Sequence, residues 1–170
     1  VKLALTLLRA VGWLSQMNFK TRRQPAGPLI RTPGAQCRGR HSFEYAVIPH
    51  KGGWTQAYKE AHFYVNRLWA FETGFHGGEL PPEGSFIEVE PPSLVVSTVK
   101  PAENKRGVIV RFYNITDGEA EGRVKLYKPF SKAYLTSLNE QPIKEVKPDH
   151  DGYLRLKVRG GKIVTIRFDP

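Results

Sequence analysis

The second half of the chain consists of short runs in which apolar and polar residues alternate. A period of two residues is typical of a half-buried β-strand, because successive side chains point to opposite faces. In the clearest run, Leu154, Leu156 and Val158 alternate with arginine and lysine, which predicts a strand with a basic outer face. The pattern predicts six strands, at residues 93–100, 107–115, 121–128, 132–138, 152–160 and 162–168.

The segments between these runs indicate how the strands are connected. They read TDGE, NEQP, DHDG and RGGK, and they are rich in residues that favour turns. The Arg159-Gly160-Gly161-Lys162 segment predicts a two-residue hairpin turn between the last two strands. Strands at this spacing predict a small antiparallel β-sandwich.

The first half of the chain is less regular. Residues 3–11, LALTLLRAV, fit a helix by their periodicity and a buried strand by their flanks, and we favour the strand. Residues 41–50 alternate as a strand does, whereas residues 55–69 have apolar residues at helical spacing, which predicts one short helix. Residues 77–93 concentrate proline, glycine and glutamate, which indicates a boundary. We therefore expect two domains, at residues 1–85 and 86–170.

The charge of the chain is strongly positive and uneven. The 170 residues include 26 Lys and Arg against 16 Asp and Glu, a formal net charge of +10. Most of the excess lies in residues 1–80, where no aspartate occurs. This balance suits nucleic acid, an acidic surface, or a more acidic part of a larger molecule. No helix-turn-helix, zinc-finger or RNA-binding aromatic motif accompanies the charge, so a nucleic-acid binder is only a third alternative.

The cysteine content and the opening segment bear on the compartment. The single cysteine, Cys37, excludes an internal disulfide, and we expect a cytoplasmic protein in which Cys37 is a small buried hydrophobe, not a catalytic thiol. The opening segment resembles a signal peptide, but Arg9 interrupts its apolar run and no cleavage pattern follows. No stretch approaches the roughly 20 apolar residues that span a bilayer, so we expect no membrane segment. Because the chain begins within a hydrophobic element, we expect a fragment of a longer protein.

Few residue combinations in the sequence suit catalysis. The histidines form no H-x-x-x-H pair and the one cysteine forms no C-x-x-C pair, so we expect no metal site. No G-x-S-x-G elbow occurs, and all four aspartates lie beyond residue 116, which disfavours a serine triad. Glu44 is the only acid among residues 1–59, so paired carboxylates for glycoside cleavage are absent there. The NIT sequence at Asn114 matches a glycosylation acceptor, which we interpret as a chance match.

Residues 26–54, AGPLIRTPGAQCRGRHSFEYAVIPHKGGW, combine the cysteine, two histidines and a tryptophan with almost no acid. Together with the preceding ALTLLRAVGWLS, this stretch closely resembles the C-terminal region of the glycoside hydrolase family 38 α-mannosidases, with the bacterial and archaeal branch nearest. The resemblance rests on T-L-L-R-x-V-G, A-G-P, T-P-G-A-Q-C and Y-A-x-x-P-H-x-G-x-W, and it continues through LPPEGSFIEVEPPSLVVSTVKPAE and VIVRFYNITD.

The resemblance implies a retaining α-mannosidase, a glycosidase that hydrolyses α-mannosides. In that family a catalytic (β/α) domain and a helical bundle precede the β-rich domains. The nucleophile, the acid/base carboxylate and the ligands of zinc or another divalent cation would lie in the earlier domains, so this chain alone would be inactive. The chain itself would be all-β and mainly antiparallel, comprising the end of a large mutarotase-like β-sandwich, a small β-sandwich and one short helix.

The resemblance also implies a role for the loop at residues 20–27. In the family, a loop at this position reaches toward the catalytic domain and brings an arginine to the sugar site. We therefore expect a substrate-binding role for Arg22, Arg23, Gln24 and Gly27, with a purely structural role between domains as the alternative. The implied partners are the rest of the α-mannosidase chain or a separate catalytic subunit, and an α-mannoside, within an oligomer. We expect the isolated chain to expose apolar surface and to self-associate.

The alternative function is a free-standing, non-catalytic carbohydrate-binding β-sandwich module. In that reading Trp13, Trp54 or Trp69 would stack on sugar faces. We favour the opposite interpretation of these residues, in which their large apolar rings are buried in the core.

Overall fold

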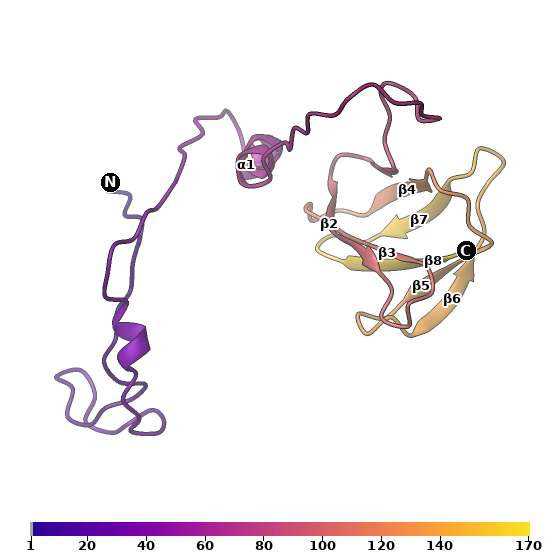
Figure 1. The fold of residues 1–170 in the computed structure, drawn as a ribbon. Helices are drawn as coiled ribbons and strands as arrows, with labels where there is room; N and C mark the ends of the chain where they lie inside the picture. Colours follow the sequence, from indigo (N-terminus) through magenta and orange to yellow (C-terminus); the bar gives the residue numbers. More distant parts are fainter. Residues whose placement is uncertain (1) are drawn as a thin grey trace. The chain divides into compact units, whose positions relative to one another are not determined.

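A computed structural model describes residues 2–170, and its contacts divide the chain into two compact units (Figure 1). The first unit ends at Val47 and the second comprises Ile48–Pro170. The first unit consists of loops with one short 3-10 helix, Pro33–Gln36. The second begins with a 3-10 turn, Trp54–Gln56, and the helix α1, Tyr58–Val65, and continues into a β-sandwich.

The sandwich contains eight strands in two antiparallel sheets. The smaller sheet has the order β1-β4-β7, formed by Ile87–Glu90, Ala120–Leu126 and Leu154–Val158. The larger sheet has the order β2-β3-β8-β5-β6, formed by Leu94–Pro101, Val108–Asn114, Ile163–Asp169, Lys132–Thr136 and Pro142–Val146. Every strand pair is antiparallel. The predicted mainly antiparallel all-β fold with one short helix is therefore confirmed.

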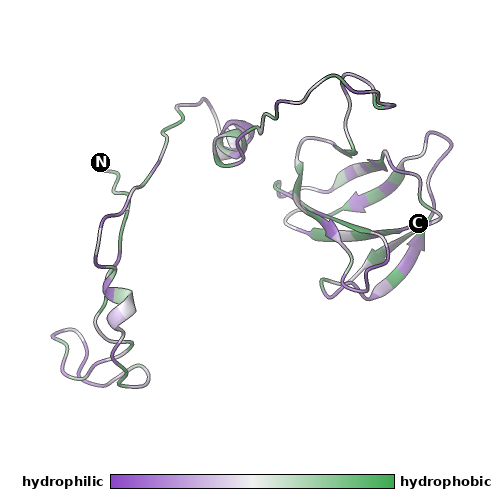
Figure 2. Ribbon diagram, viewed as in Figure 1, coloured by the Kyte–Doolittle hydropathy of each residue, from purple (hydrophilic) through white to green (hydrophobic). Residues whose placement is uncertain are grey.

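The core lies between the two sheets, where the alternation of the strands directs their apolar residues (Figure 2). Phe112 of β3 and Phe168 of β8 are the largest buried side chains. They pack in one cluster with Leu154 and Val158 of β7, so both sheets contribute. Phe130 adds an edge-to-face contact with Phe168, at 4.9 Å between ring centroids. The predicted basic outer face of β7 is confirmed, because its arginine and lysine are exposed.

The predicted hairpin between the last two strands is wrong. The turn itself is present, because the Lys162 amide donates to the Arg159 carbonyl at 3.1 Å and Gly161 has a φ of +65°. However, β7 belongs to the smaller sheet and β8 to the larger one, so the turn crosses between the layers. Both strands alternate in the same way, and alternation alone does not specify which sheet a strand joins.

Two strands were missed by the sequence pattern, and both lie at sheet edges. β1 falls within the proline-rich and glutamate-rich segment that predicted a boundary, and β6 contains a lysine and a glutamate among its five residues. Short, charged edge strands are common because they limit edge-to-edge aggregation, and the same features hide them from a hydrophobic pattern.

The first half of the chain forms the predicted helix but not the two predicted strands. The helix predicted within residues 55–69 is confirmed as α1. The strands predicted at residues 3–11 and 41–50 are wrong, because neither stretch forms a sheet within residues 2–170. A strand needs a paired neighbour for its backbone groups, and the described chain supplies none there. The boundary between domains at residues 85 and 86 stays a prediction.

Asn114 ends β3 and holds a loop in place. Its side chain is 1% exposed, and its amide nitrogen donates to the carbonyls of Gly118 at 2.8 Å and Val158 at 3.0 Å. Its side-chain oxygen accepts from the amide and the hydroxyl of Thr116, at 3.0 and 2.7 Å. Both hydrogens of the side-chain amide nitrogen are therefore used in contacts within the fold.

Replacing Asn114 by alanine is expected to lower the free energy of unfolding by about 3 kcal/mol, because several buried polar groups lose their partners at once. Urea unfolding of the 170-residue chain, followed by far-ultraviolet circular dichroism, measures this change. Asn139→Ala is the matched control, since Asn139 is exposed, and it is expected to change stability by less than about 0.5 kcal/mol. Equal effects of the two variants would contradict the role of Asn114.

Candidate functional site

The loop at residues 20–27 is the end of a longer antiparallel excursion of the backbone. The Val11 amide donates to the Ala35 carbonyl at 2.9 Å, and the Leu14 amide donates to the Ile30 carbonyl at 2.8 Å. These bonds bring the two arms of residues 11–35 together although no regular sheet forms. The excursion therefore positions its tip by backbone hydrogen bonding.

Ser15 closes the base of the loop. Its side chain is buried, and its hydroxyl oxygen accepts a 2.8 Å hydrogen bond from the amide of Ala26. Gly27 lies directly against Ser15, since a Cβ at Gly27 would sit 4.0 Å from the Ser15 Cβ. Such a short polar side chain satisfies a loop amide that no secondary structure engages. The residue predicted for substrate binding at position 27 is thus at the base of the loop, not at its tip.

The tip is a tight turn that carries the two arginines. The Arg22 amide donates to the Phe19 carbonyl at 3.2 Å, and the Asn18 amide donates to the Arg23 carbonyl at 3.3 Å. Asn18 has a φ of +62°, a left-handed conformation that asparagine adopts more readily than most residues. Arg22, Arg23 and Gln24 consequently follow one another on a turn whose backbone is held by hydrogen bonds.

The side chains of the predicted substrate-binding residues are accessible. Arg22, Arg23, Gln24 and Gly27 are all exposed. Within residues 2–170, no carboxylate lies within ion-pair distance of either guanidinium. Each guanidinium therefore keeps its full set of donors for hydroxyl or anionic groups. The loop can bind and orient a polar ligand, but it contains no group that could act as nucleophile or proton donor.

The tryptophans are arranged differently from the core-packing prediction. Trp54 is 60% exposed and Trp69 is 85% exposed, so neither belongs to the core of this chain. Trp69 stacks on Phe71 with ring centroids 6.3 Å apart. Trp13 is half-buried and the Arg31 guanidinium lies over its ring at 5.1 Å, a cation–π contact that occupies one ring face.

The described residues do not assemble a metal centre. Within residues 2–170, no three His, Cys, Asp or Glu side chains lie together as ligands would. The Nε2 atom of His41 lies 2.6 Å from the Cys37 carbonyl oxygen. Cys37 is half-buried and forms no disulfide. The divalent cation that the family resemblance implies therefore has no ligand set in this part of the chain. In the same residues, no helix has both the length and the apolar character needed to cross a membrane.

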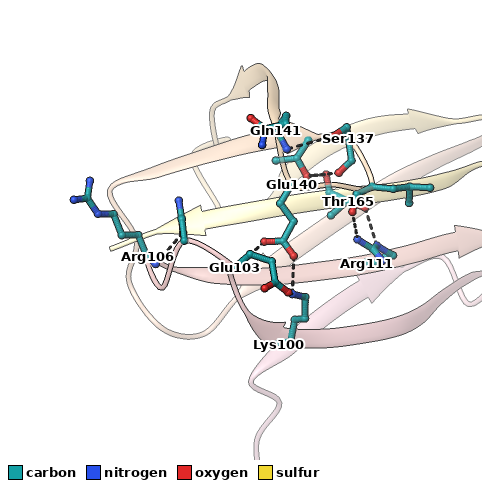
Figure 3. A network of polar contacts seen from close by, with 11 residues as sticks. Lys100, Glu103, Arg106, Arg111, Ser137, Glu140, Gln141 and Thr165 are labelled. Atoms are coloured by element: carbon teal, nitrogen blue, oxygen red, sulfur yellow. Dashed lines mark hydrogen bonds and ion pairs between the residues drawn. The ribbon is translucent and has the colours of Figure 1, made fainter.

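The sandwich contains a polar network that the sequence did not predict (Figure 3). Glu140 is buried, with a φ of +61°, and its carboxylate accepts from Lys100 Nζ at 2.7 Å and from the Glu103 amide at 2.7 Å. Lys100 also bonds Glu103, and Arg111 bonds the Thr165 hydroxyl at 3.0 Å. The network joins the β2–β3 turn to the β5–β6 turn. Its partners are up to 54 residues apart in the sequence, so no local motif reveals it.

Glu140 of this network and Asp149, which lies outside it, should make the sandwich sensitive to acid. The hydrogen bond from Lys100 and the bond from the Glu103 amide lower the pKa of Glu140, and the bond from the Tyr153 amide lowers that of Asp149. A carboxylate with a lowered pKa stabilises the fold above its unfolded pKa, and this stability is lost as the pH falls through the folded value. We expect the free energy of unfolding to decrease below about pH 4.

Urea unfolding at a series of pH values tests this expectation with Glu140→Gln, which should be less stable than the parent chain at pH 7 and should differ least at the acidic end. Glu145→Gln is the control, because Glu145 is exposed. A Glu140→Gln deficit that is independent of pH would contradict the electrostatic role of the carboxylate, while part of the acid sensitivity should remain through Asp149.

Comparison with known proteins identifies the sandwich. Residues 93–166 match the family described as glycosyl hydrolases family 38 C-terminal beta sandwich domain. A protein of Halalkalibacterium halodurans that is provisionally named a mannosylglycerate hydrolase is 28% identical over 98% of this chain. Alpha-mannosidase 2C1 of Homo sapiens is 29% identical over 76% of the chain, and Alpha-mannosidase G of Dictyostelium discoideum is 29% identical over 52%. No solved structure matches the chain significantly.

The two antiparallel sheets define a small β-sandwich, and the family match covers most of it. Residues 93–166 match the C-terminal β-sandwich domain of glycosyl hydrolases family 38, and the chain is similar to two proteins named α-mannosidases, so the family resemblance is confirmed. The chain spans less than a fifth of the length of the curated relatives that it matches, since the aligned part is 17%, 12% and 8% of them.

Proposed function

We propose that this chain is the C-terminal region of a retaining α-mannosidase, in which it supports the catalytic domain and lends residues 20–27 to the sugar site. The family match supports this proposal, together with an exposed arginine turn that has no carboxylate partner among residues 2–170. Steady-state hydrolysis of an α-mannoside by the full-length protein, with Arg22 and Arg23 present or replaced, tests it.

The chemistry would be divided between this chain and the catalytic domain. A retaining glycosidase uses two carboxyl groups about 5–5.5 Å apart, one as nucleophile and one as acid and base. Neither the loop nor its flanks contain such a pair, so both carboxylates would belong to the catalytic domain. That domain would also hold the zinc or other divalent cation, which grips sugar hydroxyls. Arg22 and Arg23 would donate hydrogen bonds to the bound sugar and orient it.

The surface of the first 86 residues supports a role within a larger assembly. Most of the exposed large hydrophobic residues in residues 2–170 precede β1, and they include Leu3, Leu68 and Phe75. A stable isolated domain does not leave so many large apolar side chains in water. We propose that the rest of the α-mannosidase chain, or a separate catalytic subunit, covers them in a cytoplasmic oligomer.

The isolated 170-residue chain is accordingly expected to bind a hydrophobic dye and to self-associate. Replacing Leu68, Trp69 and Phe71 by serine should lower dye fluorescence severalfold and reduce light scattering, because all three side chains are exposed. Serine at Val99, Tyr127 and Ile163, which are exposed on the sandwich, is the matched control and should have a smaller effect. A clean monomer without dye binding would contradict the expected apolar surface.

A second candidate function is binding of carbohydrate without catalysis. The exposure of Trp54 and Trp69 favours it, since an exposed indole can stack on a sugar face. Electrophoresis of the 170-residue chain through a mannan-containing gel tests this function. Retardation that Trp69→Ala abolishes and Trp13→Ala preserves would support it, because Trp69 is 85% exposed whereas Trp13 is half-buried beneath Arg31. Migration identical with and without mannan would exclude it.

A further inference from the structure

The two sheets of the sandwich differ in size, and β7 ends the smaller one. β7 pairs with β4 on one side and has no strand on its other side within the described residues. Beside this edge lies an open groove of about 610 Å³, and its walls come from β5, β6, β7 and β8. The apolar residues that line it are Leu135, Leu138, Ile143, Leu156, Ile163 and Val164.

Most of the exposed large hydrophobic residues of the described sandwich line this groove. Leu138 is 58% exposed, Ile143 is 71% exposed and Ile163 is 48% exposed. Only two other large hydrophobic residues of the described sandwich, Val99 and Tyr127, are exposed, and neither lines this groove. Elsewhere the alternation buries such side chains between the sheets, so their concentration here indicates an interaction surface.

All the charged residues that line the groove are basic. No acidic residue lines it, whereas Lys144, Arg159 and Lys162 do, and all three are exposed. No carboxylate in the described chain lies within 4.0 Å of these three residues. The remaining cations, Arg155 and Lys157, are already paired with Asp149 and with Glu121. An acidic ligand would therefore meet three uncompensated cations.

The free edge of β7 supplies backbone groups that suit one kind of ligand. Alternate residues of an edge strand direct their N–H and C=O groups away from the sheet, where another strand can pair with them. Strand addition uses these groups for affinity and adjacent pockets for side-chain specificity. A strand next to β7 would also cover Leu135 and Val164, which the three-stranded sheet leaves only partly buried.

We propose that the β7 edge and its groove bind an extended acidic segment of another polypeptide, which adds to the smaller sheet as a fourth strand. Its apolar side chains would enter the groove and its carboxylates would pair with Lys144, Arg159 and Lys162. This interaction does not depend on the mannosidase function, because neither the arginine loop nor any catalytic group takes part in it.

The probe is a short fluorescent peptide of alternating valine and glutamate, titrated against the 170-residue chain and followed by anisotropy. We expect saturable binding that weakens with added salt, and at least about tenfold weaker binding to Lys144→Glu/Lys162→Glu. Lys128→Glu/Lys147→Glu is the control with the same charge change, and it should bind within about twofold of the parent chain. A peptide of alternating valine and lysine should not bind.

Hydrogen exchange distinguishes strand addition from charge attraction alone. Bound peptide should slow hydrogen exchange at alternate amides of Leu154–Val158. Exchange in β2 should stay unchanged, because β2 lies at the end of the larger sheet that is farthest from β6. Three results would each overturn the proposal: no binding up to about 1 mM peptide, equal weakening by both double variants, or binding without protection of β7.

Discussion

Replacing Arg22 and Arg23 by alanine in the full-length protein is expected to lower kcat/KM for an α-mannoside by about tenfold to a thousandfold. A hydrogen bond from a charged donor contributes about 1.5–3 kcal/mol, and each 1.4 kcal/mol corresponds to a factor of ten. Both side chains are exposed and lack ion-pair partners in the described chain, so their loss should leave the free energy of unfolding unchanged. Steady-state kinetics and thermal unfolding of the same preparations measure the two quantities.

Arg38→Ala/Arg40→Ala is the matched control, because it removes the same charge from exposed positions outside the loop. It should retain kcat/KM within about twofold if long-range electrostatics contribute little. Arg22→Lys/Arg23→Lys separates charge from geometry, since lysine keeps the charge but loses the planar fork of donors. Unchanged kinetics in the alanine variant would remove the loop from the sugar site and leave it a structural role.

Replacing Phe112 by alanine is expected to lower the free energy of unfolding of the sandwich by about 4 kcal/mol, since a buried phenylalanine leaves a large cavity. Phe112 has no exposed surface and packs between both sheets. Total stabilities of single domains are about 5–15 kcal/mol, so the variant should be close to unfolding. Urea unfolding followed by far-ultraviolet circular dichroism measures the change.

Phe63→Ala is the control for this prediction, because Phe63 is exposed on α1. It should alter the unfolding midpoint only slightly, while Phe112→Leu should fall between the two. Similar midpoints for Phe112→Ala and Phe63→Ala would mean that the packing between the sheets does not determine the stability of this chain.

The strands that the sequence predicted are those whose two faces differ. All six predicted runs contain a strand, because each must bury one face and expose the other. β1 and β6 escaped prediction because neither contains a fully buried residue, so their hydrophobic pattern is weak. The assignment of β7 and β8 to different sheets depends on packing between distant segments, and no turn sequence encodes it.

The candidate site was predictable only in part. The family motifs drew attention to residues 20–27, and the structure places Arg22 and Arg23 on one exposed turn. The role of Ser15 in closing the loop was not predictable, because it depends on an amide eleven residues away. The exposure of Trp54 and Trp69 was also missed, since aromatic residues suit a core and an interface equally well.

Side-by-side hydrolysis of a chromogenic α-mannoside by the 170-residue chain and by the full-length protein tests the division of labour most directly. Circular dichroism first establishes that the shorter chain has formed its sheets. The account predicts turnover by the full-length protein and, for the folded 170-residue chain, a rate indistinguishable from that of buffer. Turnover by the purified 170-residue chain alone would contradict it, because the catalytic carboxylates would then lie within these residues.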